Sequence, residues 1–592
     1  DHAARLAALR AELAARDLAG FVVPHSDEFQ NEYLPPHAER LAWLTGFDGS
    51  AGTSVVLAGR AALFVDGRYT LQVREQADPA CWEFRHLIDE PVAGWLGSAL
   101  QAGDRLGYDA WLHTPRQVEG LRAACTRAGA ELVAVGDNPL DAVWTDQPPP
   151  PTAPIVPHPD RFAGRASADK RAEIAGALND AADCVVLTAP DSIAWLLNVR
   201  GGDVAHTPLP LSLAILHRDA TVDWCVDPAK LTDGLAAHLG NAVRLQPMDA
   251  FGDLLDALGR DGKSVQVAAD SAPAWVFDRL AAAGAELSRA ADPVTLPKAC
   301  KNDVEIEGCR HAHARDAVAI ARFLAWIDTE TPRRPVGEIE AADRLAAFRA
   351  EGEHFRDLSF DTISGSGSHG AIVHYRVTAQ TDRSLQAGEL YLVDSGAQYL
   401  DGTTDITRTV AIGTPTAEMR ERFTRVLKGH IAIATARFPA GTTGAQLDTL
   451  ARFHLWQAGL DFDHGTGHGV GSYLGVHEGP QRISKAGTGA ALEPGMVVSN
   501  EPGYYKTGEY GIRIENLVIV RPAAAPDGAE KPLLEFETVT LAPIDRRLVD
   551  TGLLTGDEIA WLDAYHARVR ETVGPMLDAD TRAWLDAATA AL

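Results

Sequence analysis

The sequence predicts a multidomain α/β protein: two related α/β domains, then an α+β domain, then a helical C-terminal extension. Three observations support this prediction. The chain of 592 residues is longer than one hydrophobic core normally supports. Its first half alternates short β-rich runs with helical stretches, and from about Thr295 a long helical stretch precedes glycine-rich strands.

We expect the first domain over residues 1–147. It opens with a helical stripe of Leu6, Leu9 and Leu13, after which FVVPHSD, SVVLA and AALFVDGRYTLQV have the pattern of short strands. The stretch TPRQVEGLRAACTRAGA is typical of a helix. Four consecutive prolines at 148–151 then predict a stiff, extended connector, because proline fits neither a helix interior nor a central strand.

The second domain, expected over 148–298, repeats this rhythm. A helix from Ser167 precedes the strand CVVLTAP, the helical segment DSIAWLLNV, the apolar run LPLSLAILH and the strand TVDWCVD. Two consecutive domains of similar size and order predict a duplicated architecture, although the two segments share no clear residue-level repeat.

The third domain, expected over 299–545, begins with a helix at 302–330 and continues with strands that carry Asp, His and Glu among glycines. The extension over 546–592 contains the pattern Thr555 to Glu558 of a capping box, followed by an amphipathic helix.

Composition excludes several classes of protein. Hydrophobic residues make up 46% and charged residues 23%, as in ordinary globular proteins. A formal net charge of −27 argues against a nucleic-acid partner. Six scattered cysteines without a CxxC pair predict free thiols, and the absence of a signal-peptide pattern or an 18-residue apolar run predicts a cytoplasmic protein without a membrane span.

The segment ELYLVDSGAQYLDGTTDITRTV carries the first pair of candidate metal ligands. Two β-like runs flank a reversal at Asp401 and Gly402, so we expect Asp394 and Asp405 to face each other across adjacent strands. Two neighbouring carboxylates repel each other unless a proton or a cation lies between them. In an enzyme cleft a metal ion is the commoner solution.

A second strand pair, MVVSNEPGYY and YGIRIENLVIV, contributes Glu501 and Glu515. Arg513 stands two residues before Glu515, and we expect both on one face of the same strand, where the guanidinium orients the carboxylates. The glycine-rich segment HGTGHGVG adds His464 and His468.

Taken singly, each of these residues has an ordinary structural explanation as a turn, capping or surface residue. Together, one imidazole and four carboxylates form an oxygen-rich set. Such a set suits two Mn, Co or Zn ions and does not suit a tetrahedral structural zinc.

The sequence resembles a known family through GAIVHY, YLVDSGAQYLDGTTDITRT, HGTGHGVG, VHEGP, NEPGYY and GIRIEN. These segments are similar to those of the Xaa-Pro aminopeptidases (aminopeptidase P) of the pita-bread metallopeptidase clan. LTGFDGSAGTSVV, FVDGRYTLQ and AWLLNVRGGDVAHTP resemble the two N-terminal, creatinase or RNase H-like domains of the long, three-domain members. The resemblance therefore implies a pita-bread catalytic domain at 299–545.

The resemblance also implies roles for the five candidate ligands. Asp394 would chelate one ion, and His468 and Glu501 would bind the other. Asp405 and Glu515 would bridge both. A hydroxide held between the two ions would attack the scissile carbonyl, and Glu501 would accept the proton of the water.

Further residues match positions around the family's substrate. By this resemblance His374 and His477 contact the substrate and stabilise developing charge, while His464 shapes the site around proline. Tyr505 and Arg513 would surround and orient the carboxylates.

Arg68, in VDGRY, resembles an arginine of the N-terminal domain that reaches the substrate. The implied activity is release of the N-terminal residue from peptides with proline in the second position. The implied cofactors are two divalent ions per subunit, with Mn²⁺ expected and Zn²⁺ or Co²⁺ as alternatives, and the implied assembly is a homodimer.

Two other functions remain open at this point. An Xaa-Pro dipeptidase shares the catalytic domain but acts only on dipeptides, and two full domains before the catalytic one favour the aminopeptidase. A non-enzymatic binding module could keep the fold without the chemistry. Retention of the complete ligand set argues against it.

Overall fold

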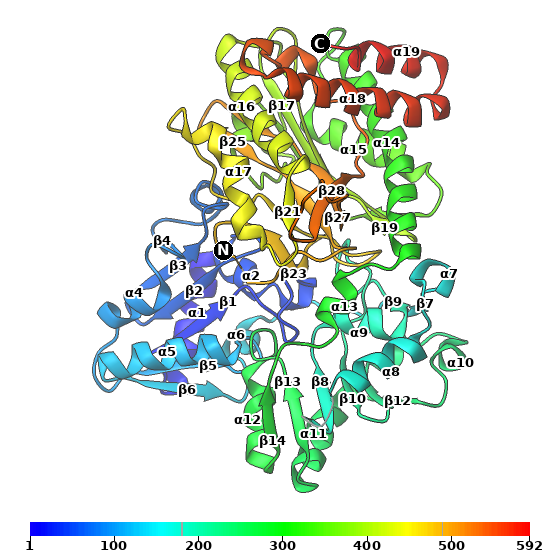
Figure 1. Cartoon of the computed structure of the whole chain (residues 1–592). Helices are drawn as coiled ribbons and strands as arrows, with labels where there is room; N and C mark the ends of the chain where they lie inside the picture. The colour runs from blue at the N-terminus through cyan, green and yellow to red at the C-terminus, as the bar shows by residue number, and fades with distance from the viewer. Residues whose placement is uncertain (179–181, 488) are drawn as a thin grey trace. The chain divides into compact units, whose positions relative to one another are not determined.

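The computed structural model describes residues 1–178, 182–487 and 489–592 (Figure 1). The chain divides into two compact units. The first comprises Asp1–Asp160 and Arg165–Thr295, and the second comprises Arg161–Gly164 and Leu296–Leu592. Both N-terminal domains thus lie in one unit, and their predicted boundaries remain predictions.

The first sheet of unit 1 has six strands in the order β4-β3-β2-β1-β5-β6. Its central strand β1 pairs antiparallel with β2 and parallel with β5. The predicted leucine stripe of the first helix is buried. The strands are β1 (Gly20–Pro24), β2 (Thr53–Leu57), β3 (Ala61–Val65), β4 (Glu83–His86), β5 (Arg105–Asp109) and β6 (Glu131–Val135), and the longer helices are α1 (His2–Ala15), α4 (Val92–Ala99) and α5 (Pro115–Ala128).

The second sheet repeats the first strand for strand. Its order is β12-β11-β10-β8-β13-β14, and its central strand β8 again pairs antiparallel with one neighbour, β10, and parallel with the other, β13. The predicted duplication is therefore confirmed at the level of topology. The strands are β8 (Cys184–Leu187), β10 (Leu213–His217), β11 (Val222–Cys225), β12 (Val243–Gln246), β13 (Ser264–Val267) and β14 (Glu286–Arg289), and the helices include α8 (Ser167–Ala177), α9 (Pro190–Leu197), α11 (Phe251–Arg260) and α12 (Ala274–Ala283).

The two halves of unit 1 share a well-packed contact. The indole rings of Trp111 and Trp275 stack with centroids 4.1 Å apart, and the backbone N–H of Trp275 donates to the carbonyl of Ala110 at 3.0 Å. Residues 148–151, the proline run, lie outside helices and strands as predicted. The stacked indole rings and the adjacent backbone hydrogen bond connect the duplicated domains, which is why they form one unit.

Unit 2 begins with the long helix predicted at 302–330, observed as α14 (Asp303–Glu330). The Asn302 side chain caps it and Glu305 returns a bond to the backbone of Asn302, a complete capping box. Helices α14 and α15 (Glu338–Ala350) accompany an antiparallel sheet of β16 (Ile363–Ser366), β17 (Leu390–Ser395) and β20 (Ile406–Ala411). Between β17 and β20 the chain forms β18 (Ala397–Tyr399) and β19 (Gly402–Thr403).

The rest of unit 2 consists of a second helix pair, a second sheet and the C-terminal helices. The sheet has the order β21-β28-β27-β24-β22-β23. Thr555 caps α18 in the predicted capping box with Glu558. The elements are α16 (Ala417–Ala434), α17 (Gly444–Trp456), β21 (Arg437–Pro439), β22 (Gly467–Gly469), β23 (Glu478–Ile483), β24 (Val497–Asn500), β25 (Gly503–Lys506), β26 (Tyr510–Arg513), β27 (Asn516–Pro522), β28 (Leu533–Thr538), α18 (Gly556–Val573) and α19 (Ala579–Ala588).

Both strands of the second predicted pair differ from the structure. MVVSNEPGYY was expected to be one strand, but it divides into β24 and β25. YGIRIENLVIV was expected to be continuous, with Arg513 and Glu515 on one face, but it divides into β26 and β27. Strand β26 pairs with β25, whereas β27 pairs with β24 and β28. The prediction of a single strand is wrong because the segment belongs to two sheets, and Glu515 lies in the break between them.

All six cysteines are free thiols, as expected. Across the described part of the chain, no helix combines the length and the apolar character needed to cross a membrane.

The cap of α14 generates a testable prediction. Asn302→Ala removes the acceptor for the N–H groups of Val304 and Glu305, at a cost of about 1 kcal/mol. We expect faster amide hydrogen exchange in the first turn of α14 and a lower unfolding temperature. The control Asn302→Asp keeps a capping oxygen, so equal protection of the first turn in the Ala and Asp variants would contradict this account.

Candidate metal centre

Three buried carboxylates, those of Asp394, Asp405 and Glu515, and the partly exposed carboxylate of Glu501 stand where strands of unit 2 begin or end. Asp394 is the last residue but one of β17, Asp405 directly precedes β20, Glu501 directly follows β24 and Glu515 directly precedes β27. Register pairing places Asp394 opposite Thr407, so Asp394 and Asp405 lie on neighbouring antiparallel strands. The backbone of a residue at the end of a strand is held by the hydrogen bonds of the sheet on one side only. Its side chain can therefore point beyond the edge of the sheet. The two predicted carboxylate pairs thus come from two different sheets.

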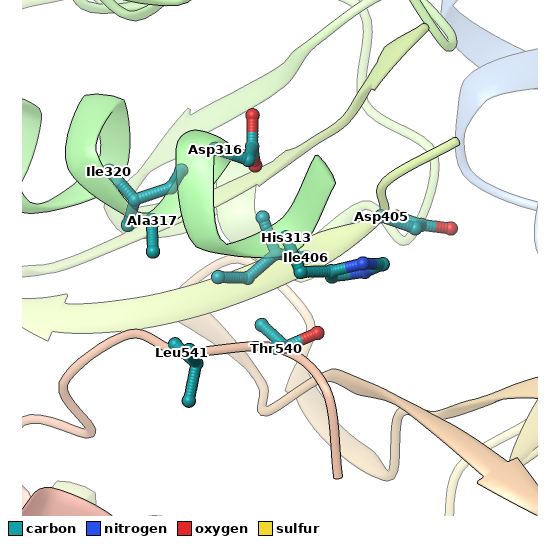
Figure 2. Close-up of a pocket in the computed structure, with 8 residues that line it drawn as sticks. All are labelled: His313, Asp316, Ala317, Ile320, Asp405, Ile406, Thr540 and Leu541. Atoms are coloured by element: carbon teal, nitrogen blue, oxygen red, sulfur yellow. The ribbon is translucent and has the colours of Figure 1, made fainter. Parts of the chain in front are cut away.

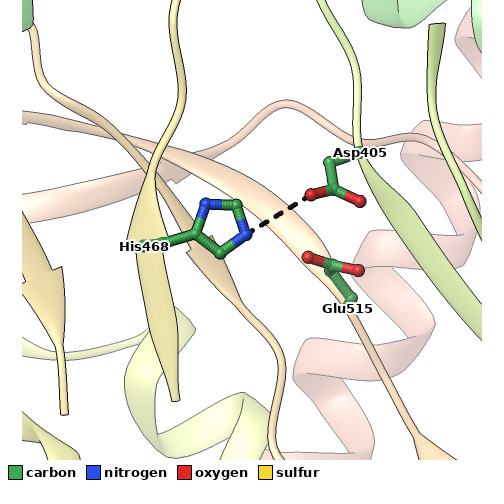
Figure 3. A group of neighbouring side chains, drawn as sticks. All are labelled: Asp405, His468 and Glu515. Atoms are coloured by element: carbon green, nitrogen blue, oxygen red, sulfur yellow. Dashed lines mark ion pairs between the residues drawn. The ribbon is translucent and has the colours of Figure 1, made fainter. Parts of the chain in front are cut away.

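His468, in the middle of β22, points its ring at these carboxylates (Figure 3). Its Nδ1 lies 2.9 Å from the carbonyl oxygen of Gly469, so Nδ1 carries a proton and donates. The other nitrogen, Nε2, lies 3.4 Å from Asp405 Oδ2 and 3.5 Å from Glu501 Oε1. One ligand atom each from Asp405, His468 and Glu515 all lie within 4.8 Å of one another. The tautomer and the spacing both suit a cation.

Burial and mutual repulsion perturb the acids of this cluster. Burial raises the pKa of Glu501 to about 7, against the lowering effect of His468 and Arg513. Burial and the neighbouring charge of Asp405 raise the pKa of Glu515 well above its ordinary value. For His468, burial lowers the pKa, but the bond to Asp405 and the charge of Glu501 outweigh it and raise the pKa to about 9. The site attracts positive charge.

Two buried carboxylate oxygens of the cluster also favour a bound cation. Within the described residues, Asp394 Oδ1 and Asp405 Oδ1 are buried and have no hydrogen-bond partner. A buried oxygen without a donor costs free energy unless a ligand supplies the missing interaction. Oxygen-rich donors with one imidazole are the set that divalent ions such as Mn²⁺ prefer, so the residues present fit a metal centre.

A chain of hydrogen bonds runs from Asp394 to His464. Arg513 donates to Asp394 Oδ2 at 2.6 Å and to the hydroxyl of Tyr505 at 2.6 Å. The Tyr505 hydroxyl lies 2.8 Å from His464 Nε2. Arginine only donates, so Tyr505 accepts from it and donates to His464. The Nδ1–H of His464 donates to the carbonyl of Gly465 at 2.7 Å.

The other predicted histidines differ in how closely the structure ties them to the centre. The ring of His477 packs edge-on against His468, with centroids 4.3 Å apart. His374 follows Val373, whose carbonyl accepts from Arg513 at 3.4 Å, and this bond places the segment beside the carboxylates.

Arg68 belongs to unit 1, whereas the residues of the centre belong to unit 2. Its guanidinium pairs with Asp66 at 2.7 Å and approaches Glu32 at 3.6 Å. Its contribution to a substrate site remains a prediction.

Sequence reasoning missed two hydroxyl groups that hold the carboxylates. Thr407 Oγ1 donates to Glu515 Oε2 at 2.7 Å and accepts from Arg513 Nε at 3.1 Å. Ser499 Oγ donates to Glu501 Oε1 at 3.1 Å and accepts from the backbone N–H of His468 at 2.9 Å. Both stand two residues from a candidate ligand on a strand, which is the spacing that puts two side chains on one face.

A small cavity lies beside Asp405 (Figure 2). His313 and Asp316 of α14 line it together with Thr540 and several aliphatic side chains. Its free volume of about 10 Å³ holds at most one water molecule, which is too little for a peptide. His313, which sequence reasoning also missed, projects its ring from the helix into this space.

Family models match nearly the whole chain. The Creatinase/Prolidase N-terminal domain matches twice, at residues 5–142 and 146–305. Metallopeptidase family M24 matches residues 307–522, and the C-terminal region of peptidase M24 matches 532–592.

Curated relatives match at full length. The chain is 42% identical to a probable Xaa-Pro aminopeptidase P of Laccaria bicolor, over 98% of this chain and 92% of the relative. It is 39% identical to aminopeptidase P2 of Arabidopsis thaliana, over 95% of this chain and 85% of the relative.

Solved structures separate two kinds of neighbour. The X-prolyl aminopeptidase of Caenorhabditis elegans, described as a cytosolic enzyme with a di-nuclear active site, aligns with a TM-score of 0.96 at 34% identity over 100% of both chains. An Xaa-Pro dipeptidase from Bacillus anthracis aligns with a TM-score of 0.52 at 25% identity, over 64% of this chain and 99% of its own.

The perturbed acids predict how pH acts on the centre. Without metal, the folded chain binds more protons than the unfolded chain, because the pKa of Glu501 rises from 4.5 to about 7 and that of His468 from 6.5 to about 9. The contribution of these two groups to the stability of the metal-free protein therefore falls as pH rises between about 5 and 9. A divalent cation must displace these protons, so its apparent affinity rises with pH, by about tenfold per pH unit for each proton released.

Calorimetric titration of metal-free protein with Mn²⁺, in buffers of different ionisation enthalpy, measures the number of protons released. Thermal unfolding at pH 6 and pH 8.5, with and without Mn²⁺, measures the stability change. Proton-free binding, together with an unfolding temperature of the metal-free protein that rises with pH, would contradict the electrostatic account.

Proposed function

This chain belongs to the Xaa-Pro aminopeptidase P family within metallopeptidase family M24, and we propose that it releases the N-terminal residue from peptides whose second residue is proline. The observation that carries this function is the convergence of Asp405, His468 and Glu515, beside Glu501 and Asp394, at the strand ends of unit 2. Full-length similarity to aminopeptidases supports the bond that is cleaved.

Asp394, Asp405, His468, Glu501 and Glu515 would hold two divalent ions. When bound, such ions polarise the scissile carbonyl and lower the pKa of a water molecule. The hard oxygen donors favour Mn²⁺ as the ion, with Zn²⁺ and Co²⁺ as alternatives.

Glu501, directly after β24 and beside the other candidate ligands, would be the proton acceptor. It would take a proton from the attacking water and return one to the leaving amine. The Ser499 hydroxyl donates to Oε1 of this carboxylate at 3.1 Å and so helps to fix its orientation. His477, packed against His468, and His374 would stabilise charge that develops on the substrate.

His464 and Tyr505 would line the part of the site that contacts the proline ring of the substrate. Both ring nitrogens of His464 are engaged, one by the Tyr505 hydroxyl and one by the carbonyl of Gly465, so the ring offers carbon atoms to a ligand. The X-Pro bond is a tertiary amide without an N–H, so apolar contact suits its ring better than an acceptor does. Arg68 would contact the peptide from unit 1.

The dipeptidase alternative explains less of the chain. The B. anthracis dipeptidase corresponds to 64% of this chain, whereas the C. elegans aminopeptidase corresponds to all of it. Loss of catalysis in a binding module would remove the selection for metal-binding side chains at the ligand positions, yet all four carboxylates and the histidine are present. Aminopeptidase action on Xaa-Pro peptides is therefore the function supported.

Assays of Xaa-Pro-Xaa peptides test this function. Asp405→Asn removes one anionic ligand, and we expect kcat/KM to fall by at least about 100-fold without loss of fold. The matched control is Asp401→Asn, a nearby buried aspartate that pairs with Arg315 outside the centre.

Hydrolysis by wild type should require added Mn²⁺ after chelation and should extend to tripeptides and longer chains. Cleavage restricted to Xaa-Pro dipeptides would favour the dipeptidase. Equal rates for wild type and Asp405→Asn would rule out the proposed centre.

The proposed location and partners rest on the comparison with the C. elegans enzyme and on the charge and helices of this chain. A cytosolic location is proposed because the C. elegans neighbour is described as a cytosolic enzyme. Neither nucleic acid nor membrane is proposed as a partner, in keeping with the charge of −27 and with the helices found in the described residues. The partner is the peptide substrate.

A homodimer is the proposed assembly, with helix α17 at the interface. Leu450, Phe453 and Trp456 recur every third residue along this helix and are 38%, 49% and 42% exposed. An exposed apolar stripe of this kind is typical of a contact surface, and a second copy of the chain would bury it.

Sedimentation velocity tests the assembly. Phe453→Glu places a charge in the stripe, and we expect it to convert dimers into monomers. The control Leu296→Glu changes an exposed leucine of α13 (Thr295–Ala299) and should leave dimers intact. A monomeric wild type at micromolar concentration would contradict the proposal.

A further inference from the structure

A buried histidine that the proposed chemistry does not use lies behind two of the candidate ligands. His430 of α16 is fully buried and contacts Asn500 and Asn516. These asparagines directly adjoin Glu501 and Glu515, and they are register partners on β24 and β27. A single side chain therefore touches both strand ends that carry the glutamates.

Hydrogen-bond chemistry assigns every donor in this network. Arg408 can only donate, and its guanidinium lies 2.8 Å from Asn516 Oδ1, so that oxygen accepts. Asn516 Nδ2 is then the donor to His430 Nε2 at 3.2 Å. His430 Nδ1 must carry the proton and donates to the carbonyl of Asn500 at 3.1 Å. The Asn500 amide returns a bond to the carbonyl of His430 at 2.9 Å.

Arg408 connects this network to the ligands themselves. The guanidinium donates to the carbonyl oxygens of Glu515 and Thr407, at 2.6 and 2.9 Å. Thr407 in turn holds Glu515 through its hydroxyl. Charge-assisted bonds to backbone carbonyls are among the stronger ones available in a protein interior.

The His430 ring keeps one protonation state. Burial and the nearby charge of Arg408 lower the pKa of His430 to about 3, so the ring stays neutral. A protonated Nε2 would place its hydrogen against the amide hydrogens of Asn516. The ring therefore serves as a fixed spacer with one acceptor and one donor edge.

We propose that His430 is a positioning residue that sets the separation of Glu501 and Glu515, and thereby the affinity of the centre for its divalent ions. The inference rests on the proposed function, because it takes these glutamates as ligands. Strand β24 ends at Asn500 and β27 starts at Asn516, and just beyond them the backbone N–H groups of Glu501 and Glu515 donate to the carbonyls of Thr466 and Thr407. These bonds hold each glutamate to a different neighbour, whereas the His430 bridge links the two strand ends to each other.

Groups hydrogen-bonded directly to metal ligands typically change metal affinity or activity by 10- to 100-fold when they are lost. His430 acts one residue further out, through Asn500 and Asn516, and we expect an effect within the same range. A purely structural histidine would instead lower stability without changing affinity. Metal affinity and unfolding temperature, measured on the same variants, separate the two roles.

The experiment titrates metal-free full-length protein with Mn²⁺ by calorimetry. His430→Phe keeps the ring shape and removes both nitrogens, and we expect Mn²⁺ to bind 10- to 100-fold more weakly. His430→Asn, a milder change, imitates the Nδ1 donor without the Nε2 acceptor, and we expect at least a fivefold loss. In both variants kcat should fall more than KM changes.

His566→Phe is the matched control. His566 is also fully buried and neutral, with a pKa lowered to about 3, but its Nε2 accepts from the backbone N–H of Ile544 and not from either asparagine. We expect a lower unfolding temperature with Mn²⁺ affinity within twofold of wild type.

Wild-type Mn²⁺ affinity in His430→Asn would overturn the inference, even if His430→Phe does not fold. An equal loss of affinity in His566→Phe would overturn it as well, because any buried histidine would then have the same effect. Failure of wild type to bind Mn²⁺ would instead contradict the proposed function, so the two failures are distinguishable.

Discussion

Repulsion among buried carboxylates is the constraint on which the catalytic unit depends. Asp394, Asp405 and Glu515 are each less than 10% exposed, and Glu501 adjoins them. Burial raises the pKa values of Asp394, Glu501 and Glu515, so in the absence of a cation the cluster retains protons. Divalent ions relieve this repulsion. The same burial that makes the cluster costly also excludes water from the charges that act on a substrate.

The surrounding fold supplies donors at the points where repulsion is greatest. Arg513 neutralises one oxygen of Asp394, and Thr407 and Ser499 hold single oxygens of the glutamates. Arg408 works through the backbone, since it donates to the carbonyl of Glu515. Each donor engages only part of a carboxylate, so the remaining oxygens can serve as ligands. In each of these carboxylates, one oxygen thus accepts a hydrogen bond that orients the side chain, and the other can bind a metal ion.

Arg513 also links the centre to the histidine proposed to contact proline. It donates both to Asp394 and to Tyr505, and the Tyr505 hydroxyl lies 2.8 Å from His464 Nε2. If His464 contacts proline as proposed, a change there would also disturb a candidate metal ligand. One guanidinium would then couple substrate recognition to metal binding.

Much of this organisation was predictable from the sequence. Periodicity located the leucine stripe of α1, the helix α14 and the capping box of α18, because these features depend on neighbours three or four residues apart. Clustering of Asp, His and Glu among glycines, together with the family resemblance, identified the candidate ligands. The duplicated rhythm of the N-terminal half predicted a duplication that the two strand orders confirm.

Other features required the tertiary structure. The break between β26 and β27 depends on two different partner strands, and neither partner is visible from the local pattern. The roles of Thr407 and His430 likewise depend on contacts with residues 108 and 86 positions away. The sequence by itself thus determined the chemistry of the donor set, because residue type decides what an atom can bind. Only the tertiary structure decided which atoms meet, because long-range strand pairing brings distant segments together.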